Sequence, residues 1–391
     1  MIKSFGFGKL PLIFFGAGKV EQLSQLIRRY GEKILLVTGK FSFLNTPAGI
    51  RFREIAEKEG LNLSSLVISG EPSDLMIDDA VSAYRNDMPD VIVAIGGGSA
   101  MDAGKAISAM ITVEGNIKNF LEGVGYLDHP GTKIPFIAVP ATSGTGSEAT
   151  KNAVISRIGE DGFKKSLRHD NFVPDIALVD PELTITCPPD ITAASGMDCF
   201  TQLAEAYLST KSNLYTDALA IEGLKAVKAS LVKAYLDGSD TEARSGMAFA
   251  ALTSGICLAN AGLGVVHGFA SSAGGLYEIP HGLICGTLMA VSNELTVKRL
   301  REKKDGQTAL DKYAVLAKLF LSDTGAKDDN ELTDEFIEYL HKLTAELRLP
   351  GLKEAGITES SLEKIALITE CKNNPVELDT PDLMEILHRR L

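Results

Sequence analysis

Residues 89–106 read Pro-Asp-Val-Ile-Val-Ala-Ile-Gly-Gly-Gly-Ser-Ala-Met-Asp-Ala-Gly-Lys-Ala, and this stretch decides the fold. The apolar run at 91–95 is too short for a helix and rich in β-branched residues, so it predicts a strand buried on both faces. Three glycines follow it directly: Gly96, Gly97 and Gly98. Ser99 is a good N-cap residue, and we expect a helix over 100–110 to begin behind it.

The predicted strand, glycine turn and helix start together indicate an anion site. Because the glycines have no Cβ atoms, the backbone N–H groups of the turn can approach a ligand closely. The turn also lies at the positive end of the helix dipole. The spacing matches neither the G-x-G-x-x-G motif nor the Walker A loop. A tight turn also favours glycine, but three in a row exceed what turning requires. We therefore favour phosphate as the ligand.

Composition limits the class of protein. With 391 residues, of which 45% are hydrophobic, the chain can build two domains with sizeable cores. A formal net charge of −12 argues against nucleic acid or an anionic membrane as a partner. The five cysteines are scattered and odd in number, which indicates reduced thiols in a cytoplasmic protein. The first residues lack the apolar run of a signal peptide.

The first half of the chain alternates between strand and helix patterns. Strands are expected at 12–15, 33–38, 61–68, 91–95, 133–139, 153–157 and 176–179, and helices at 18–29, 49–59, 74–86 and 100–110. This order predicts an α/β domain with a doubly wound, mostly parallel sheet and helices on both faces. Ligands of such sheets bind beyond the carboxyl ends of the strands, where the glycine turn lies.

The second half is expected to be all helical. Helical periods cover 192–208, 214–236, 241–257, 282–300, 309–321, 334–347 and 360–369. Residues 245–277 carry no Asp, Glu, Lys or Arg, but their many small residues favour closely packed helices over a membrane span. We place the domain boundary near residue 185, which gives a dinucleotide-binding domain at 1–185 and a helical domain at 186–391.

Two further stretches carry chemistry. Residues 140–148 follow a predicted strand with hydroxyls and exposed N–H groups, and beside the glycine turn they suit a diphosphate. In the helical half, Asp198 and Gln202 lie four residues apart on one helix face. His267 and His281 each precede a glycine, so one carboxylate, one amide and two imidazoles are available for iron or zinc. Buried histidines are more often satisfied by hydrogen bonds than bound to metal, so spacing alone makes this a modest prediction.

Several uncommon motifs, in one order, resemble those of the iron-containing (group III) alcohol dehydrogenases, which are related in fold to dehydroquinate synthase and glycerol dehydrogenase. The motifs are 96–105, 140–148, 174–181, Gly-Met-Asp at 196–198, His-Gly at 267–268 and Pro-His-Gly at 280–282. The resemblance covers nearly the whole chain and implies the same two-domain, dehydroquinate synthase-like architecture.

The resemblance also implies roles for residues. Gly97, Gly98 and Ser99 would cradle the pyrophosphate of a nicotinamide dinucleotide. Thr142 and Thr145 would contact its phosphates and ribose, and Lys165, or its neighbour Lys164, would reach the nicotinamide. The implied cofactor site also includes Gly96, Asp102, Ser143, Asn152 and Val179. Asp198, His267 and His281 would hold a metal, Fe²⁺ or Zn²⁺, beside a small alcohol or aldehyde that exchanges a hydride with the nicotinamide.

The chain departs from the family pattern at two positions. The family has a histidine ligand four residues after the aspartate, where this chain has Gln202, and an amide oxygen is a poorer ligand for iron or zinc. A second histidine, thought to relay a proton, often lies four residues after the first histidine of the later pair. Here that position is Ser271, a hydroxyl that does not titrate near neutral pH. We retain Gln202 as the fourth metal ligand and Ser271 as a proton relay.

The end of the strand at 33–38 predicts the dinucleotide. An acidic residue there binds the adenosine ribose of NAD and repels a 2′-phosphate. Family members that prefer NAD often have an Asp at this place, whereas this chain has Gly39 followed by Lys40 and Ser42. These residues leave room for a phosphate and can bind it, so we expect NADP to be preferred over NAD. Alternatively, Gly39 merely turns the chain and Lys40 is solvated.

The leading hypothesis is a metal-assisted, NAD(P)-dependent alcohol dehydrogenase or aldehyde reductase that forms a homodimer or larger homo-oligomer. One alternative is a reductase of the same fold with weak or no metal dependence, similar to maleylacetate reductase, which Gln202 would fit. Dehydroquinate synthase chemistry is disfavoured, because the segments around the metal residues have almost no Lys or Arg for an anionic substrate. A non-catalytic nucleotide-binding protein with an eroded metal site is the alternative from another class.

Overall fold

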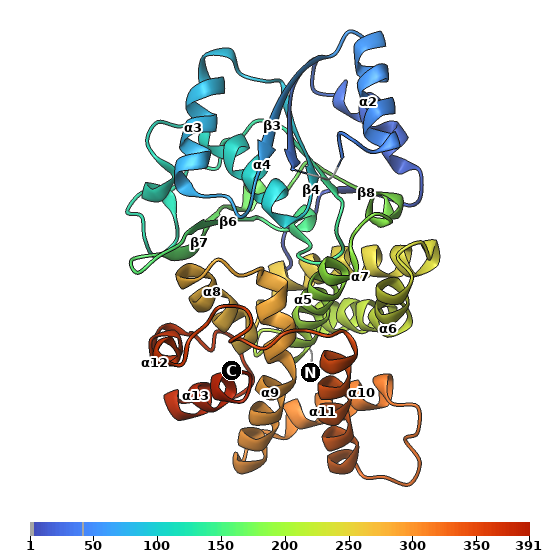
Figure 1. Ribbon diagram of the computed structural model, residues 1–391, viewed down its shortest axis with the longest axis vertical. Coiled ribbons are helices and arrows are strands. Elements are labelled where there is room, and N and C mark those ends of the chain that lie inside the picture. The colour runs from blue at the N-terminus through green and yellow to red at the C-terminus, as the bar shows by residue number, and fades with distance from the viewer. Residues whose placement is uncertain (1–3, 41–42) are drawn as a thin grey trace.

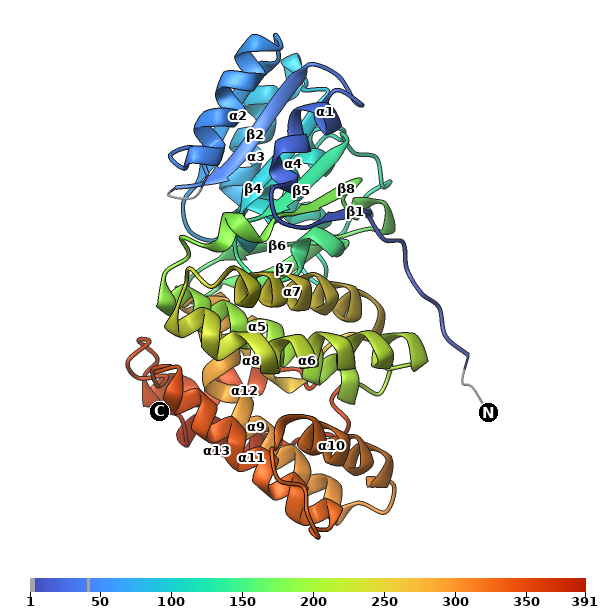
Figure 2. The same ribbon diagram turned by 90° about the vertical axis from the view of Figure 1, so that its right-hand side faces the viewer.

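The computed structural model describes residues 4–40 and 43–391 and places a parallel sheet above a helical part (Figures 1 and 2). Its six strands have the order β1-β8-β5-β4-β2-β3, and all of their pairings are parallel. The strands are β1 Leu12–Phe15, β2 Lys33–Gly39, β3 Asn62–Ile68, β4 Val91–Gly96, β5 Phe136–Pro140 and β8 Ile176–Val179. This arrangement confirms the predicted parallel sheet.

Strand β4 lies inside this sheet, between β2 and β5, and all of its residues are buried. Its register pairs Ile95 with Thr38 on one side and Gly96 with Pro140 on the other. The glycine turn and the 140–148 loop therefore leave the sheet side by side at its carboxyl edge, as expected from the order of the strands.

Helices cover both faces of the sheet, because successive strand residues enter different cores. One core packs the strands against α3 Asp74–Tyr84 and α4 Gly98–Met110 through Leu35, Val37, Ile92, Ala94, Phe136 and Ala138. The other packs them against α1 Leu23–Ile27 and α2 Pro47–Lys58 through Ile34, Leu36, Val91, Val93, Ile95, Ile137 and Val139. The sheet is therefore doubly wound.

The first half differs from expectation in three local features. The expected helix at 18–29 begins as a 3-10 turn, Lys19–Gln22, before the short α1. The prediction that Ser99 caps the helix expected at 100–110 is wrong. Helix α4 starts at Gly98, and Gly97 holds the cap position with extended backbone and no side-chain bond, so Ser99 lies inside the first turn.

The third difference is a hairpin. The expected strand at 153–157 forms as β6 Asn152–Arg157, but it lies outside the parallel sheet. It pairs antiparallel with β7 Phe163–Arg168, a strand that the sequence pattern missed. The hairpin contacts α4 and α8, so it lies between the sheet and the helical part.

No strand is present among the described residues that follow Val179. The helices are α5 Pro189–Leu208, α6 Leu214–Leu236, α7 Thr241–Ala261, α8 Val265–Leu276, α9 His281–Glu302, α10 Gln307–Phe320, α11 Asp329–Glu346, α12 Glu359–Ile368 and α13 Thr380–His388. Helices α8 and α13 were not predicted. The last strand of the sheet ends at Val179 and α5 begins at Pro189, on either side of the boundary that we place near residue 185.

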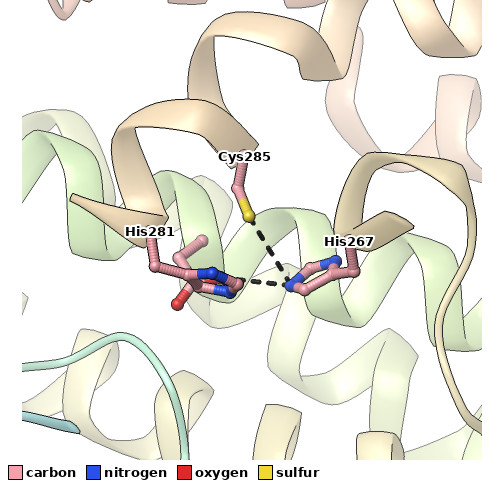
Figure 3. A group of neighbouring side chains, drawn as sticks. His267, His281 and Cys285 are labelled. Carbon is pink, nitrogen blue, oxygen red and sulfur yellow. Dashed lines mark hydrogen bonds and ion pairs between the residues drawn. The ribbon is translucent and has the colours of Figure 1, made fainter. Parts of the chain in front are cut away.

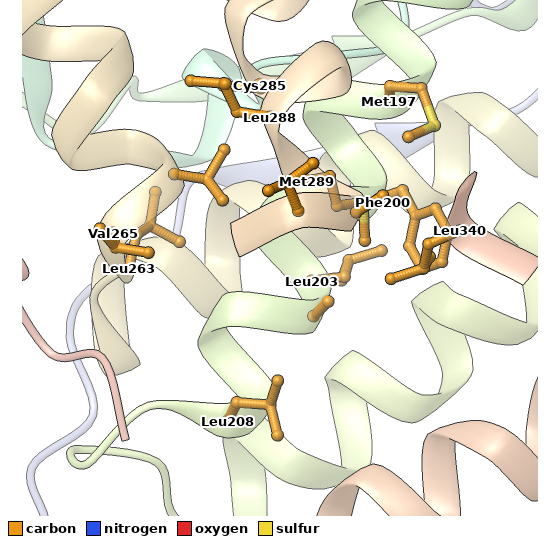
Figure 4. Packing of buried hydrophobic residues seen from close by; sticks show 14 of the residues in the cluster. Met197, Phe200, Leu203, Leu208, Leu263, Val265, Cys285, Leu288, Met289 and Leu340 are labelled. Carbon is orange, nitrogen blue, oxygen red and sulfur yellow. The ribbon is translucent and has the colours of Figure 1, made fainter. Parts of the chain in front are cut away.

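Helix α5 is central to the helical core. It contacts α6, α7 and α9 along its length. Met197, Phe200 and Leu203 of α5 are fully buried and pack with Leu288 and Met289 of α9 (Figure 4). Because α5 also carries Asp198 and Gln202, this packing fixes the position of both polar side chains.

Within the described part of the chain, no single helix has the length and hydropathy to cross a membrane. Helices α7 and α8 meet this criterion when taken together, but they are bent by 97° at the break between them.

Candidate active site

A single large cavity reaches from the carboxyl edge of the sheet into the helical part. Its volume is about 2460 Å³, larger than the ~300–1,000 Å³ of an ordinary small-ligand pocket. The glycine turn and the 140–148 loop line one side, and Asp198, His267 and His281 line the other. The cavity therefore has room for a dinucleotide and a small substrate together.

The glycine turn is open to this cavity and close to the second loop. Gly97, Gly98 and Ser99 line the cavity at the N-terminus of α4. A Cβ atom built on Gly98 would lie 2.8 Å from Cγ2 of Thr145, and one on Gly97 would lie 3.4 Å from Oγ1 of Thr142. Glycine at 98 is thus required by the close approach of the two loops. The exposed helix start fits a phosphate group.

Lys105 holds the second loop against α4. Its Nζ is buried and donates hydrogen bonds to the carbonyl and hydroxyl oxygens of Ser147 (2.9 and 3.1 Å), to Oγ1 of Thr150 (3.1 Å) and to the carbonyl of Asn152 (2.6 Å). Asp102 accepts from Oγ of Ser147 (2.6 Å). Burial lowers the pKa of Lys105 to about 8. Its role was not predicted, although a Lys three residues after an Asp in an apolar helix was a usable signal.

Replacement of Lys105 by Met is expected to lower the free energy of unfolding by about 3–5 kcal/mol, because Asp102 and Glu148 would remain buried without their cation. The loop should also shift and weaken cofactor binding. Lys151→Met is the matched control. Lys151 lies in the same connection between β5 and β6 and pairs with the exposed Asp170, so its loss should cost at most about 1 kcal/mol. Urea denaturation and cofactor titration check both variants, and equal stability of the two would contradict this account of Lys105.

On the other side of the cavity, four side chains bring their donor atoms together, and Figure 3 labels three of them, His267, His281 and Cys285. They are Asp198 of α5, His267 of α8, and His281 and Cys285 of α9, and one donor atom of each lies within 4.8 Å of all the others. Oδ1 of Asp198 is 3.2 Å from Nε2 of His267 and 3.7 Å from Nε2 of His281. Sγ of Cys285 is 3.7 Å from Nε2 of His267. Cys285 was not predicted, though it follows His281 by one helical turn.

Gly282 allows helices α5 and α9 to pack closely at this cluster. A Cβ atom there would lie 2.4 Å from the carbonyl oxygen of Ala194 and 3.3 Å from Cβ of Asp198. The glycine that follows His281 therefore lets α9 approach α5 closely, which brings the His281 ring to the Asp198 carboxylate.

Glu205, three residues beyond Gln202 on α5, fixes the His267 ring. Its Oε2 lies 2.6 Å from Nδ1 of His267, and its Oε1 accepts from the backbone N–H of Val266 (2.7 Å). A carboxylate on one ring nitrogen, with the other nitrogen facing a donor cluster, is the usual arrangement of a metal-bound imidazole. The sequence prediction missed Glu205, but its spacing of seven residues from Asp198 places it on the same helix face.

The charge state of the cluster suits a cation. Burial lowers the pKa of His281 to about 4, so the ring is neutral at neutral pH, and its Nδ1 has no hydrogen-bond partner among the described residues. Burial opposes ionisation of Asp198, but the imidazoles of His281 and His267 outweigh it and keep the carboxyl pKa below its usual value. Burial opposes protonation of His267, but the neighbouring Cys285, Glu205 and Asp198 outweigh it and hold the pKa of this ring well above its usual value. A divalent transition metal would replace that positive charge among a carboxylate, two imidazole nitrogens and a sulfur.

The two residues that depart from the family pattern also lie here. Nε2 of Gln202 donates to Oδ1 of Asp198 (3.3 Å), and its Oε1 accepts from Oγ of Ser254 (2.9 Å). Ser271 lines the cavity; its hydroxyl donates to the carbonyl of His267 (2.9 Å) and accepts from Nζ of Lys372 (3.3 Å). The metal role of Gln202 and the relay role of Ser271 stay predictions.

The structure brings most of the expected cofactor residues to the cavity wall: Gly97, Gly98, Ser99, Asp102, Thr142, Thr145, Asn152 and Lys165. Lys164 also lines it, but its Nζ is paired with Glu71. Gly96, Ser143 and Val179 are buried and do not line the cavity. Gly39 and Lys40 lie at the end of β2, beside β4, and Ser42 falls outside the described residues.

The cavity contains cationic side chains, contrary to the expectation used to disfavour an anionic substrate. The segments around the metal residues carry almost no Lys or Arg, but Lys165 of β7 lines the cavity, as do Arg348 and Lys372 from loops near the C-terminus. These segments are distant in sequence, so local composition could not show that they meet here.

Comparisons with known proteins agree on one family. The model described as "Iron-containing alcohol dehydrogenase" matches residues 11–181, and that of the "Fe-containing alcohol dehydrogenase family, C-terminal" matches residues 192–391. "Alcohol dehydrogenase 4" of Saccharomyces cerevisiae (strain YJM789) is 31% identical over 98% of both chains. "NADPH-dependent butanol dehydrogenase" of Clostridium saccharobutylicum is 32% identical over 96% of this chain and 95% of its own. A crystal structure of 1,3-propanediol oxidoreductase superposes with a TM-score of 0.87 at 27% identity, covering 100% of both chains.

Proposed function

We propose, from the premise that this chain belongs to the iron-containing alcohol dehydrogenase family, that it transfers a hydride between NADP(H) and a small alcohol or aldehyde beside a divalent metal ion. Membership makes the chain an oxidoreductase of the alcohol dehydrogenase class. One observation carries the proposal: a single cavity joins an anion-binding helix start to a buried carboxylate–imidazole–thiol cluster.

The sheet side of the cavity would bind the cofactor. Backbone N–H groups of Gly97 and Gly98 at the start of α4 would bind the pyrophosphate, and Thr142 and Thr145, which also line the cavity, would add hydroxyl donors. Lys165, on the hairpin between the sheet and the helical part, lines the cavity and would reach the nicotinamide. In this orientation the reactive end of the cofactor would lie toward the metal residues.

The helical side would hold the metal through Asp198, His267 and His281, with iron or zinc as candidates. The bound metal would polarise a carbonyl oxygen or lower the pKa of an alcohol. The remaining work falls to the chain: Glu205 orients His267, and the buried walls of α5, α8 and α9 restrict water. Ser271, hydrogen-bonded to Lys372, offers a polar route from the cavity to solvent.

A screen of short alcohols and aldehydes tests this function. Metal-free protein and protein loaded with iron or zinc are each assayed with NADPH, NADH and their oxidised forms. We expect metal-dependent turnover of at least one alcohol–aldehyde pair. Full turnover without metal would instead support the reductase alternative, and cofactor binding with no turnover would support the non-catalytic alternative.

The preference for NADP(H) rests on the end of β2. Gly39 is the last residue of this strand, one residue beyond the pair Thr38–Ile95 and so next to the glycine turn. Gly39 itself has no carboxylate that could repel a 2′-phosphate, and Lys40 follows it in the sequence. The relatives are named for NADPH as well as for NAD, so the choice depends on this chain's own residues.

Gly39→Asp is expected to shift the ratio of kcat/KM for NADPH over NADH about 10–100-fold toward NADH, because the new carboxylate repels the 2′-phosphate and accepts from the ribose hydroxyls. Lys40→Ala should lower kcat/KM with NADPH more than with NADH. Steady-state kinetics with both cofactors measures the ratios. A wild type that favours NADH, or an unmoved ratio in the Asp variant, would mean that this strand end does not select the dinucleotide.

The proposal includes a cytoplasmic location and a homodimer or larger homo-oligomer. All five cysteines are free, which suits a reducing compartment. Sedimentation of the purified protein tests the oligomer.

A further inference from the structure

We infer that Cys285 is the fourth protein ligand of the metal in this chain and that Gln202 is not a ligand. The inference rests on the proposed metal site, and it concerns which side chain completes that site. The fourth ligand of Asp198, His267 and His281 would then be the thiolate of Cys285 in place of the amide of Gln202.

The distances in the cluster match a tetrahedral site. With metal–nitrogen and metal–oxygen bonds of about 2.0–2.1 Å and a metal–sulfur bond of about 2.3 Å, the donor atoms of a tetrahedral zinc site lie roughly 3.3–3.7 Å apart. The observed separations are 3.2 Å for Asp198–His267, 3.7 Å for Asp198–His281 and 3.7 Å for Cys285–His267. Sγ of Cys285 therefore lies at a ligand–ligand distance from His267 and within 4.8 Å of the donor atoms of Asp198 and His281.

Gln202 faces the cluster with a donor and not with an acceptor. Its Nε2 points at Oδ1 of Asp198, the same oxygen that faces both histidines, while its Oε1 is held by Ser254 on α7. To bind a metal, the amide would have to turn over and leave Asp198. We therefore assign Gln202 a positioning role, in which it orients the Asp198 carboxylate.

The chemistry of the donor atoms favours the same assignment. Asp198, Cys285 and His267 are buried side by side, and a thiolate is a stronger ligand for a divalent transition metal than a neutral amide oxygen. On binding, the Sγ–H bond of Cys285 breaks, an Sγ–metal bond forms and the proton leaves to solvent, with no change of oxidation state. Because thiolate is a soft ligand, the site should prefer zinc to iron(II).

Cobalt(II) tests the assignment, because thiolate–cobalt bonding gives a charge-transfer band in the near ultraviolet that oxygen and nitrogen ligands do not give. We expect wild-type apoprotein to bind one Co²⁺ and show this band. Cys285→Ser should lose the band and bind zinc roughly 100-fold more weakly. Gln202→Ala should keep the band. Cys257→Ser is the matched control: this buried thiol donates to the carbonyl of Thr216, away from the cluster, and its loss should leave the band unchanged.

Three outcomes would overturn the inference: bound cobalt without the band in wild type, a band that persists in Cys285→Ser, or cobalt-loaded Gln202→Ala that lacks the band. Of these, bound cobalt without the band leaves the proposed function standing. Wild type that binds no metal at all overturns both. X-ray absorption of the zinc-loaded wild type decides the matter if Cys285→Ser does not fold, since one sulfur at about 2.3 Å is expected and its absence refutes the inference.

Discussion

His267→Ala is expected to remove the metal and to lower kcat/KM for the alcohol about 1000-fold, while cofactor binding remains unchanged. The ring supplies Nε2 to the cluster, 3.2 Å from Asp198, and links that cluster to Glu205 through Nδ1. Without it, two buried carboxylates lose their shared partner. A metal acting as a Lewis acid contributes several kcal/mol, and each ~1.4 kcal/mol changes a rate tenfold.

Elemental analysis and steady-state kinetics measure this prediction, with a melting curve to establish that the variant is folded. His341→Ala is the control, because His341 is part-exposed on α11, pairs with Glu294 and lies outside the cavity. If His267→Ala retains the metal content of the wild type, the metal does not bind at this cluster.

The parallel sheet and its glycine turn could be predicted because their signals are local. A short β-branched run, three glycines and a helical period follow one another within residues 89–110, and β4, the turn and α4 form there. The β7 strand was missed because Lys164 and Lys165 break the apolar alternation. Burial of Lys164 there depends on Glu71, which lies far away in the sequence. Helix α8 was missed because Gly268, Gly274 and Gly275 weaken its helical period, and its packing against α9 and the hairpin stabilises it.

The candidate site divides in the same way. Asp198, His267 and His281 stand in recognisable motifs, and the structure brings them together. Cys285 stands in no expected motif, and its place at the cluster requires that α5, α8 and α9 converge. The orientation of Gln202 likewise depends on Ser254 of α7, a contact across 52 positions that no spacing on α5 could predict.

Gly98→Val is expected to weaken dinucleotide binding about 100-fold and to leave the metal site intact. The first added atom, Cβ, would lie 2.8 Å from Cγ2 and 3.1 Å from Oγ1 of Thr145. Side chains on a helix tilt toward its N-terminus, so we expect the two methyl groups of valine to enter the space before the start of α4. A phosphate then cannot approach the backbone N–H groups, and charge-assisted hydrogen bonds worth roughly 1.5–3 kcal/mol each are lost. Titration of the cofactor by fluorescence or calorimetry measures the change.

A second variant separates phosphate occlusion from displacement of Thr145. Gly98→Val combined with Thr145→Ala removes the clash between the loops but still fills the anion site, so we expect affinity to stay as low as in Gly98→Val. Thr145→Ala alone gives the reference for loss of its hydroxyl. Recovery of affinity in the double variant would place the effect in the loop and not in the anion site.

Because the metal residues lie on α5, α8 and α9, each variant should still bind one metal ion per chain. Gly98→Val would then impair cofactor binding and His267→Ala would impair metal binding, in two parts of the same cavity. Unchanged cofactor affinity in Gly98→Val would contradict this division.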